Sequence, residues 1–202
     1  MDSASTTLHE QIQQLHLQLL SKSPIYNFLL QAITFHSLQP PPTRPTITTA
    51  QGPRPQASIT ASLPLTQIHL NSHHSLHGAV AATIVDWVGG IVIATLPRDA
   101  DSTALTTPRG VSVDIHVRYL SAAAKLGDVL LIRAHSHKIG RNLAFVSVQL
   151  SVNKPKRKSS KGAADGQQQQ QQQQQQQVEE EEEEDEEVCV VEASHTKYIS
   201  SP

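Results

Sequence analysis

A single carboxylate lies inside the most apolar stretch of the chain. Asp86 stands near the middle of residues 79–96, where most of the other side chains are apolar. A buried carboxylate costs free energy unless it is paired or used, and burial by itself raises its pKa. No basic residue shares this stretch, and Arg98 lies beyond its end. We therefore predict a general base with a raised pKa. An Asp that bonds the backbone or pairs with an arginine is the structural alternative.

His77 and Gly78 come directly before this stretch and would begin its helix. The first backbone N–H groups of a helix have no partner within it, and glycine lets a ligand approach them closely. The helix start is therefore a candidate oxyanion site for acyl transfer. The alternative for His77 is an ordinary residue of the first helical turn.

The spacing of these residues bears on how they could work together. His77 lies nine positions before Asp86. On a helix this gap puts the two side chains on opposite faces, roughly 13 Å apart along the axis. One chain cannot easily direct both at one carbonyl carbon, whereas two chains related by a two-fold axis can. We therefore predict that the site requires a dimer.

The histidines near the helix start raise the question of a metal site. His73 and His77 have the spacing of two helical zinc ligands, but no Glu follows the first histidine and no Cys or carboxylate nearby completes the set. We predict no metal and no cofactor. The single cysteine, Cys189, allows no internal disulfide and is interpreted as a small apolar residue of a strand.

The apolar patterns predict one α+β domain in which an antiparallel sheet covers a long helix. Helices are expected at residues 8–20, ended by Pro24, and at 76–96, with a short apolar segment at 26–30. Strands are expected at residues 32–38, 57–65, 111–119, 129–138, 143–152 and 188–198. A helix that is apolar on nearly all sides needs more cover than one curved sheet gives, which again indicates a partner subunit.

Residues 154–187 form a low-complexity insert with a basic run, eleven glutamines and an acidic run. They contain too little apolar surface to offset the entropy of ordering, so we predict disorder. The strand expected after them must return to the sheet, which makes the insert a long hairpin loop. The expected organisation is a lead-in at 1–24, a domain formed by 25–153 with 188–199, and the insert at 154–187.

Charge and hydropathy limit the partners and the location. A net charge of −2 gives no global field for nucleic acid. Asp86 argues against a membrane span at residues 79–96. The first residues resemble neither a transit peptide nor a secretory signal, so we expect a cytoplasmic protein. The mitochondrion and the nucleus are alternatives, the latter because residues 155–158 resemble a basic import signal.

Six short motifs occur in order along the chain. They are Asn-Ser-His-His-Ser-Leu-His-Gly-Ala-Val at 71–80, followed by Asp86; Gly-Val-Ser-Val-Asp at 110–114; Tyr-Leu-Ser at 119–121; Lys-Leu-Gly-Asp at 125–128; Lys-Ile-Gly-Arg-Asn-Leu-Ala-Phe at 138–145; and His-Thr-Lys-Tyr at 195–198. This series resembles the PaaI-type hotdog-fold acyl-CoA thioesterases. The resemblance implies a hotdog fold, a homodimer that is usually paired into a homotetramer, and hydrolysis of acyl-CoA to a free fatty acid and CoA.

Carried over by position, the resemblance also implies site residues. Asp86 would activate the attacking water and Ser112 would position it. The N–H of Gly78 would hold the thioester oxygen, while Asn71 and His77 would orient the acyl carbonyl and the water. In the family these groups come from two subunits, in agreement with the spacing argument. The implied CoA-binding residues are Tyr119, Leu120, Ser121, Lys125, Lys138, Gly140, Arg141, Asn142, Leu143 and Tyr198.

Two departures from the family pattern and two alternative functions remain. Ala79 stands where the family commonly has a second glycine, and residues 122–124 contain one residue more than the pattern. A non-catalytic binder of acyl-CoA or acyl-carrier protein on the same fold is one alternative, but a binder does not need the Asp86 carboxylate. An interaction protein acting through the insert is the other.

Overall fold

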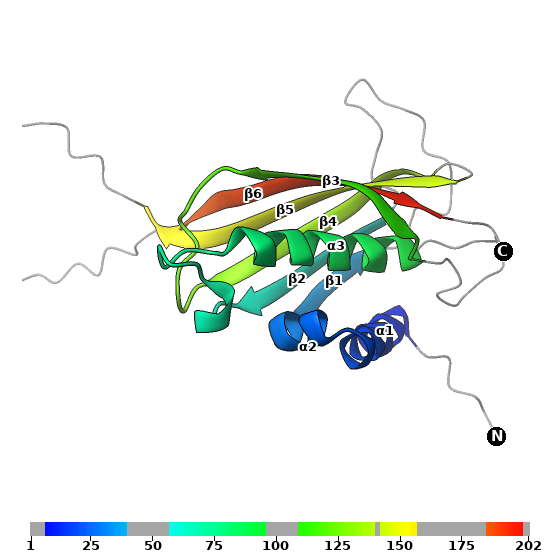
Figure 1. Ribbon diagram of the computed structural model, residues 1–202, viewed down its shortest axis with the longest axis horizontal. Coiled ribbons are helices and arrows are strands. Elements are labelled where there is room, and N and C mark those ends of the chain that lie inside the picture. The colour runs from blue at the N-terminus through cyan, green and yellow to red at the C-terminus, as the bar shows by residue number, and fades with distance from the viewer. Residues whose placement is uncertain (1–6, 40–56, 96–108, 140–141, 157–184, 200–202) are drawn as a thin grey trace, which may run out of the picture.

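The computed structural model describes residues 7–39, 57–95, 109–139, 142–156 and 185–199 (Figure 1). The helices are α1 (Leu8–Lys22), α2 (Pro24–Leu30), a 3-10 turn (Gln67–His69) and α3 (Gly78–Ala94). The strands are β1 (Thr34–Gln39), β2 (Ala57–Pro64), β3 (Val111–Tyr119), β4 (Val129–Ile139), β5 (Leu143–Pro155) and β6 (Asp185–Tyr198). The predicted α+β class is confirmed.

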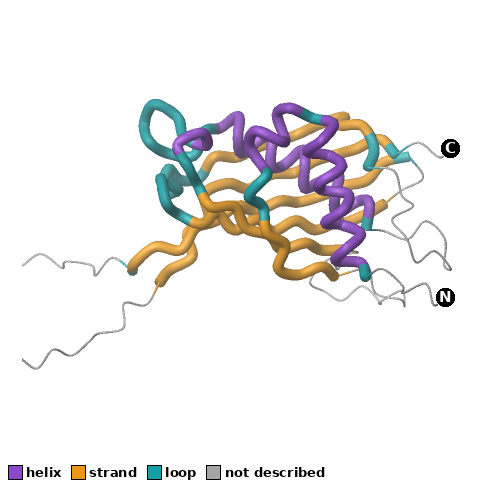
Figure 2. The backbone as a smooth tube through the Cα atoms, turned by 90° about the horizontal axis from the view of Figure 1, so that it is seen from below, coloured by secondary structure: helices purple, strands orange, loops and turns teal. Residues whose placement is uncertain are grey.

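The six strands form one antiparallel sheet in the order β1-β2-β4-β5-β6-β3. The chain leaves α3, forms β3 at one edge, and later inserts β6 between β3 and β5. Figure 2 shows the helices gathered on one face of the strands. As a result, the inward side chains of β3 and β6 face α3, which becomes the central element of the core.

Helix α3 is buried on most of its surface, as its apolar sequence predicts. Strand β2 packs against this core with Ile59, Ala61 and Leu63, which are almost fully buried. The remaining accessible side chains of α3 are mainly those of Ala79, Ala82, Thr83 and Asp86, which recur at helical spacing and so form one stripe. We call this the open stripe of α3.

The N-terminal helices cover part of α3. Ile12 of α1 and Leu30 of α2 are fully buried. The ring of His16 in α1 packs edge-on against Trp87 of α3, with centroids 5.3 Å apart. Helices α1 and α2 of the same chain therefore bury part of α3, and the partner subunit stays a prediction.

Pro24 separates two helices and begins the second of them. Helix α1 starts with a capping box of Thr7 and Glu10 and ends at Lys22. Pro24 occupies the first turn of α2, where its missing N–H costs nothing, and Ser23 caps the new helix by accepting from the N–H of Tyr26 at 3.4 Å. The apolar segment at 26–30 is consequently helical.

Strands β5 and β6 confirm that the insert lies within a hairpin. They pair from Leu143↔Tyr198 to Pro155↔Asp185, so the ladder continues into both ends of the predicted insert. Glu187 is held there by Ser151 Oγ, which donates to it at 2.6 Å, and by Arg133 Nη2 at 2.9 Å. The disorder predicted for the centre of the insert concerns residues 157–184, which lie outside the described residues.

In the part of the chain that the structure describes, none of the helices combines the length and apolar character needed to cross a bilayer.

Candidate active site

Asp86 lies on the open stripe of α3 and is held by three donors. Its Oδ1 accepts from Ser112 Oγ at 2.7 Å and lies 3.4 Å from Lys197 Nζ. Its Oδ2 accepts from the hydroxyl of Tyr26 at 2.6 Å. The side chain keeps 34% of its surface exposed. The carboxylate is thus fixed in orientation while one side remains open to a ligand.

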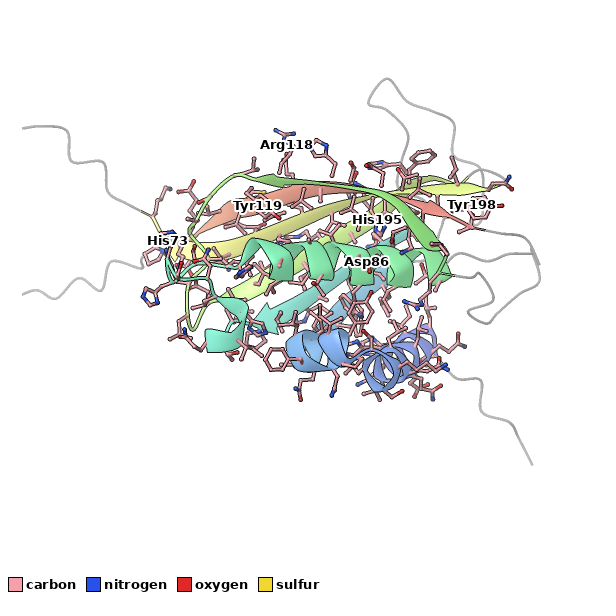
Figure 3. All side chains as sticks on the ribbon, viewed as in Figure 1. His73, Asp86, Arg118, Tyr119, His195 and Tyr198 are labelled. Carbon is pink, nitrogen blue, oxygen red and sulfur yellow. The ribbon has the colours of Figure 1, made fainter. Side chains whose placement is uncertain are left out.

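Two residues of β6 complete this arrangement. His195 Nε2 lies 3.0 Å from Ser112 Oγ, and Lys197 Nζ donates to the same oxygen at 3.1 Å. Because Ser112 gives its proton to Asp86, His195 presents Nε2–H to the serine. Figure 3 shows Asp86 and His195 side by side between α3 and the sheet. We call Tyr26, Asp86, Ser112, His195 and Lys197 the carboxylate cluster.

The pKa of Asp86 differs from the prediction. Burial raises the pKa of this carboxyl, but the hydrogen bonds from Tyr26 and Ser112 and the positive charge of Lys197 outweigh burial and leave the pKa below its ordinary value. The predicted raised pKa is therefore wrong. No basic residue lies near Asp86 along the chain, whereas strand pairing brings Lys197 to it from β6.

The two β6 side chains are themselves perturbed by burial. Lys197 is only 4% exposed, and burial lowers the pKa of its ammonium while the nearby Asp86 opposes that change. Burial, followed by the charge of Lys197, lowers the pKa of His195 to about 4. At neutral pH the cluster therefore holds a neutral imidazole beside an ammonium–carboxylate pair.

The start of α3 forms a second group of residues. His77 is the N-cap, and its Nδ1 accepts from the N–H of Ala79 at 3.1 Å. The hydroxyl of Tyr119, at the end of β3, donates to the carbonyl of Gly78 at 3.0 Å. A Cβ on Gly78 would come within 3.2 Å of the Tyr119 ring, so this close approach favours glycine. Asn71, His77, Gly78 and Tyr119 are called the helix-start cluster.

Asn71 organises the turn that leads into the helix. Its Oδ1 accepts from the N–H of His73 at 2.9 Å and from both the N–H and the Oγ of Ser75 at 3.2 Å. His74 closes the turn with a positive φ of 55°. The amide oxygen is thereby used inside the turn, and the amide N–H groups are the part of Asn71 that can donate to a substrate carbonyl.

The structure brings the predicted catalytic residues together in two sets rather than one. Asp86 and Ser112 are in contact, and Asn71, His77 and Gly78 gather at the helix start. Asp86 lies eight positions after Gly78 on α3, which corresponds to about 12 Å along the axis. Within one chain, the oxyanion donor and the base do not face a common point.

The predicted CoA-binding residues also divide. Tyr119, Leu120, Ser121 and Lys125 follow one another at the far end of β3, whereas Leu143 pairs with Tyr198 beside the first residue of β3. Figure 3 shows Tyr119 and Tyr198 towards opposite ends of the sheet. The Asn142 carbonyl accepts from the N–H of Ile199 near the second group. The side chain of Lys138, and Gly140 and Arg141 as a whole, lie outside the described residues.

Sequence reasoning missed three members of the carboxylate cluster. His195 and Lys197 lay in a recognised motif without an assigned role. Their alternation with outward residues of β6, next to the buried Ala193, is the signal that could have placed both on the inner face. For Tyr26 the sequence offers no comparable signal.

The histidines near the helix start have structural contacts. Buried His69 bonds the carbonyl of Leu29 through Nε2 at 3.0 Å and accepts from the N–H of Thr66 at its Nδ1. His73 and His77 lie in the turn and at the cap, so they do not occupy successive turns of a helix. Among the described residues, no three His, Cys, Asp or Glu side chains are placed to hold a metal ion.

Comparison with known proteins identifies the domain. Residues 73–158 match the family model described as thioesterase superfamily. They form a thioesterase superfamily domain. The chain is 40% identical over 83 residues to acyl-coenzyme A thioesterase 13 of Homo sapiens, which covers 41% of this chain and 53% of the human protein. The chain thus spans about half the length of the curated relatives it matches.

Solved structures show the same fold. Thioesterase superfamily member 2 of zebra fish is similar with a TM-score of 0.61 and 23% identity, over 97% of this chain and 100% of that chain. A hypothetical thioesterase protein of Streptococcus pneumoniae, solved with coenzyme A, has a TM-score of 0.56 and 15% identity, over 94% of this chain and 97% of that chain. The predicted hotdog fold and the resemblance to the thioesterase family are both confirmed.

Proposed function

We propose that the chain is an acyl-CoA thioesterase that hydrolyses fatty acyl-CoA to a fatty acid and CoA. The observation that carries the proposal is an ionised carboxylate, Asp86, held by Ser112 on the only open stripe of the described part of α3. It lies within a thioesterase superfamily domain, and the similar human protein is named for this activity. A structure of the same fold was solved with coenzyme A.

In the proposed reaction Asp86 takes a proton from a water molecule as the water oxygen attacks the thioester carbon. Ser112 holds the carboxylate and this water in line. The resulting oxyanion accepts hydrogen bonds from the N–H of Gly78 and the amide of Asn71. When the C–S bond breaks, the CoA sulfur leaves with the electron pair and receives the proton from Asp86, which restores the carboxylate.

A lowered pKa makes Asp86 a weak base in the free protein, and substrate binding offsets this. The exposed side of Asp86 is in contact with water until an acyl chain lies along the open stripe. Removing that water disfavours the charged form and so raises the basicity of the carboxylate. The donors on the other side keep it ionised and oriented before substrate arrives.

The exposed edge of the sheet supports a site shared by two subunits. Strand β3 is an edge strand, and Val111 and Val113 are 71% and 61% exposed. Antiparallel pairing of two such edges about a two-fold axis places the Ser112 end of one strand beside the Tyr119 end of the other. The carboxylate cluster of one chain then faces the helix-start cluster of its partner, and the divided CoA-binding residues are joined in the same way.

The catalytic role is tested by Asp86→Asn, which keeps the shape of the side chain and removes the base. We expect thiol release from a fatty acyl-CoA to fall about a hundredfold or more, with an unchanged circular dichroism spectrum. Full activity in this variant would contradict the mechanism. Acyl-CoA binding by the parent protein without thiol release would instead support the alternative of a non-catalytic binder.

The shared site is tested by mixing two inactive variants. In a dimer of Asp86→Asn with Asn71→Ala, one site carries both changes and the other carries neither. If chains exchange freely, we expect the mixture to recover roughly a quarter of the parent activity, since half of the dimers are mixed and each has one intact site. The absence of recovery, with mixed dimers confirmed by mass spectrometry, would place each site within one chain.

A further inference from the structure

The hydroxyl of Tyr26 is a part of the carboxylate cluster that comes from outside the sheet and α3. It belongs to α2 and donates to Asp86 Oδ2 at 2.6 Å, a short bond that is typical of a charged acceptor. Oδ1 is occupied by Ser112 and Lys197. Among the described residues, Tyr26 is the donor that fixes the second oxygen and therefore the plane of the carboxylate.

Helix α2 holds the tyrosine firmly in this position. Ser23 caps the helix through the N–H of Tyr26, and Leu29 and Leu30 anchor it in the core. The Leu29 carbonyl also bonds buried His69 at 3.0 Å, which ties α2 to the segment before α3. The ring of Tyr26 is half-buried between these contacts, so its hydroxyl is presented to Asp86 with little freedom.

We propose that Tyr26 is a positioning residue of the active site, which orients the Asp86 carboxylate and stabilises its ionised form before substrate binds. The proposal rests on the proposed function, in which Asp86 is the base. It gives the N-terminal helices a role in the chemistry in addition to their role as cover for α3.

The groups around Asp86 come from different elements, so the effect of Tyr26 on the carboxylate can be separated from the effects of the other groups. Ser112 reaches the carboxylate from β3, and His195 and Lys197 reach it from β6. Arg109, just before β3, approaches the tyrosine hydroxyl. Burial, followed by the bond to Asp86, raises the pKa of Tyr26 well above its ordinary value, so the hydroxyl remains a neutral donor over the whole working range of pH.

Removing the hydroxyl of Tyr26 leaves Ser112, His195 and Lys197 in place. In Tyr26→Phe the ring still packs between α2 and α3, but Oδ2 loses its donor. The ionised form of Asp86 is then less favoured, and its orientation is less restricted. We expect the acid limb of the kcat/KM profile to move to higher pH, and kcat on the plateau to fall about threefold to tenfold.

The test compares Tyr26→Phe with Asn27→Ala, an exposed neighbour on the same helix. The pH dependence of kcat/KM is measured with a fatty acyl-CoA. The Asp86 carboxyl is titrated in parallel by carbon-detected NMR, with its signal assigned from its loss in Asp86→Asn. The proposal expects both the acid limb and the NMR titration to move upward in Tyr26→Phe and neither to move in Asn27→Ala, with similar melting temperatures in all three proteins.

The two readouts distinguish the ways in which the idea can fail. An unchanged NMR titration in a folded Tyr26→Phe protein would overturn the role of Tyr26, whatever the activity. A shifted titration with an unchanged acid limb would show that Asp86 is not the base, which overturns the positioning role and the proposed mechanism together. If the parent protein released no thiol, the proposed function would fall, and the titration alone would still decide whether Tyr26 stabilises the carboxylate.

Discussion

The donors around Asp86 lower the basicity of its carboxylate and at the same time fix its orientation. Each hydrogen bond to a carboxylate favours its ionised form and lowers its pKa, so three donors make a weaker base than an isolated buried Asp. The same bonds remove the rotational freedom of the side chain. A reaction that depends on the placement of one water gains more from a fixed carboxylate than it loses in basicity.

At the helix start, contact with Tyr119 makes Gly78 sensitive to a single methyl group. Gly78→Ala keeps the N–H proposed to bind the oxyanion but places a Cβ within 3.2 Å of the Tyr119 ring. The ring must shift, which weakens its bond to the Gly78 carbonyl. We expect kcat/KM to fall about fivefold, the value of one neutral hydrogen bond, with little change in melting temperature.

Ala79→Gly is the matched control for that substitution. It alters the next position of the same turn and restores the second glycine of the family pattern. Since the Ala79 side chain is exposed, we expect kcat/KM within about twofold of the parent enzyme. Equal losses in the two variants would mean that flexibility of the turn, rather than contact with Tyr119, controls the activity.

Two adjacent glycines in α3 show how the helix and β6 are fitted together. A Cβ on Gly89 would lie 2.4 Å from Nδ1 of buried His195, whereas a Cβ on Gly90 would make ordinary contacts with Arg109 at 3.4 Å or more. Gly89 therefore permits the imidazole to reach Ser112 across the helix surface. Gly90 has no such requirement.

Substituting each glycine with alanine should therefore give opposite results. Gly89→Ala must displace His195, and we expect a loss of about 1–3 kcal/mol in the free energy of unfolding together with reduced thiol release. Gly90→Ala should stabilise the helix by about 0.4–1 kcal/mol and leave the activity intact. Urea unfolding and a thiol assay check both variants, and a Gly89→Ala protein as stable and active as Gly90→Ala would disprove the close fit.

The elements differ in how far the sequence predicts them. Strand β3 was predicted with its observed ends, and α3 within two residues, because strong periodicity and turn residues bound them. Helix α2 is too short for a helical period to be visible, and Pro24 can end one helix or begin another. The pairing of Asp86 with Lys197 depends on strand order, which residue spacing does not reveal.

At the scale of the whole molecule, the candidate site contains residues from the N-terminal helices, from α3 and from the sheet. The carboxylate cluster combines α2, α3, β3 and β6, and the helix-start cluster joins the turn before α3 to the end of β3. The insert enters the sheet at the opposite end of β6 from Lys197 (Figure 1). In the proposed dimer each site combines the carboxylate cluster of one chain with the helix-start cluster of the other.

The packing of these layers makes the stability depend on pH. Burial lowers the pKa of His16, between α1, β1 and α3, and of His195, between α3 and β6. In the unfolded chain a histidine takes up its proton near pH 6.5. As the pH falls below that value, the unfolded state binds more protons than the folded state, so the free energy of unfolding decreases. For His195, whose folded pKa is about 4, the window runs from about 6.5 to about 4 and amounts to about 3 kcal/mol.

His16→Leu separates the contribution of the N-terminal helix. Both ring nitrogens of His16 are buried without hydrogen-bond partners among the described residues. An apolar side chain of similar size should raise the free energy of unfolding at pH 7.5 by about 1 kcal/mol and reduce its decline between pH 6.5 and 5. Urea unfolding at several pH values measures both effects, with exposed His73→Gln as the control. If the free energy of unfolding of His16→Leu declined with falling pH as steeply as that of the parent protein, protonation of His16 would not contribute to the decline. The acid sensitivity would then come from the β6 side of the core.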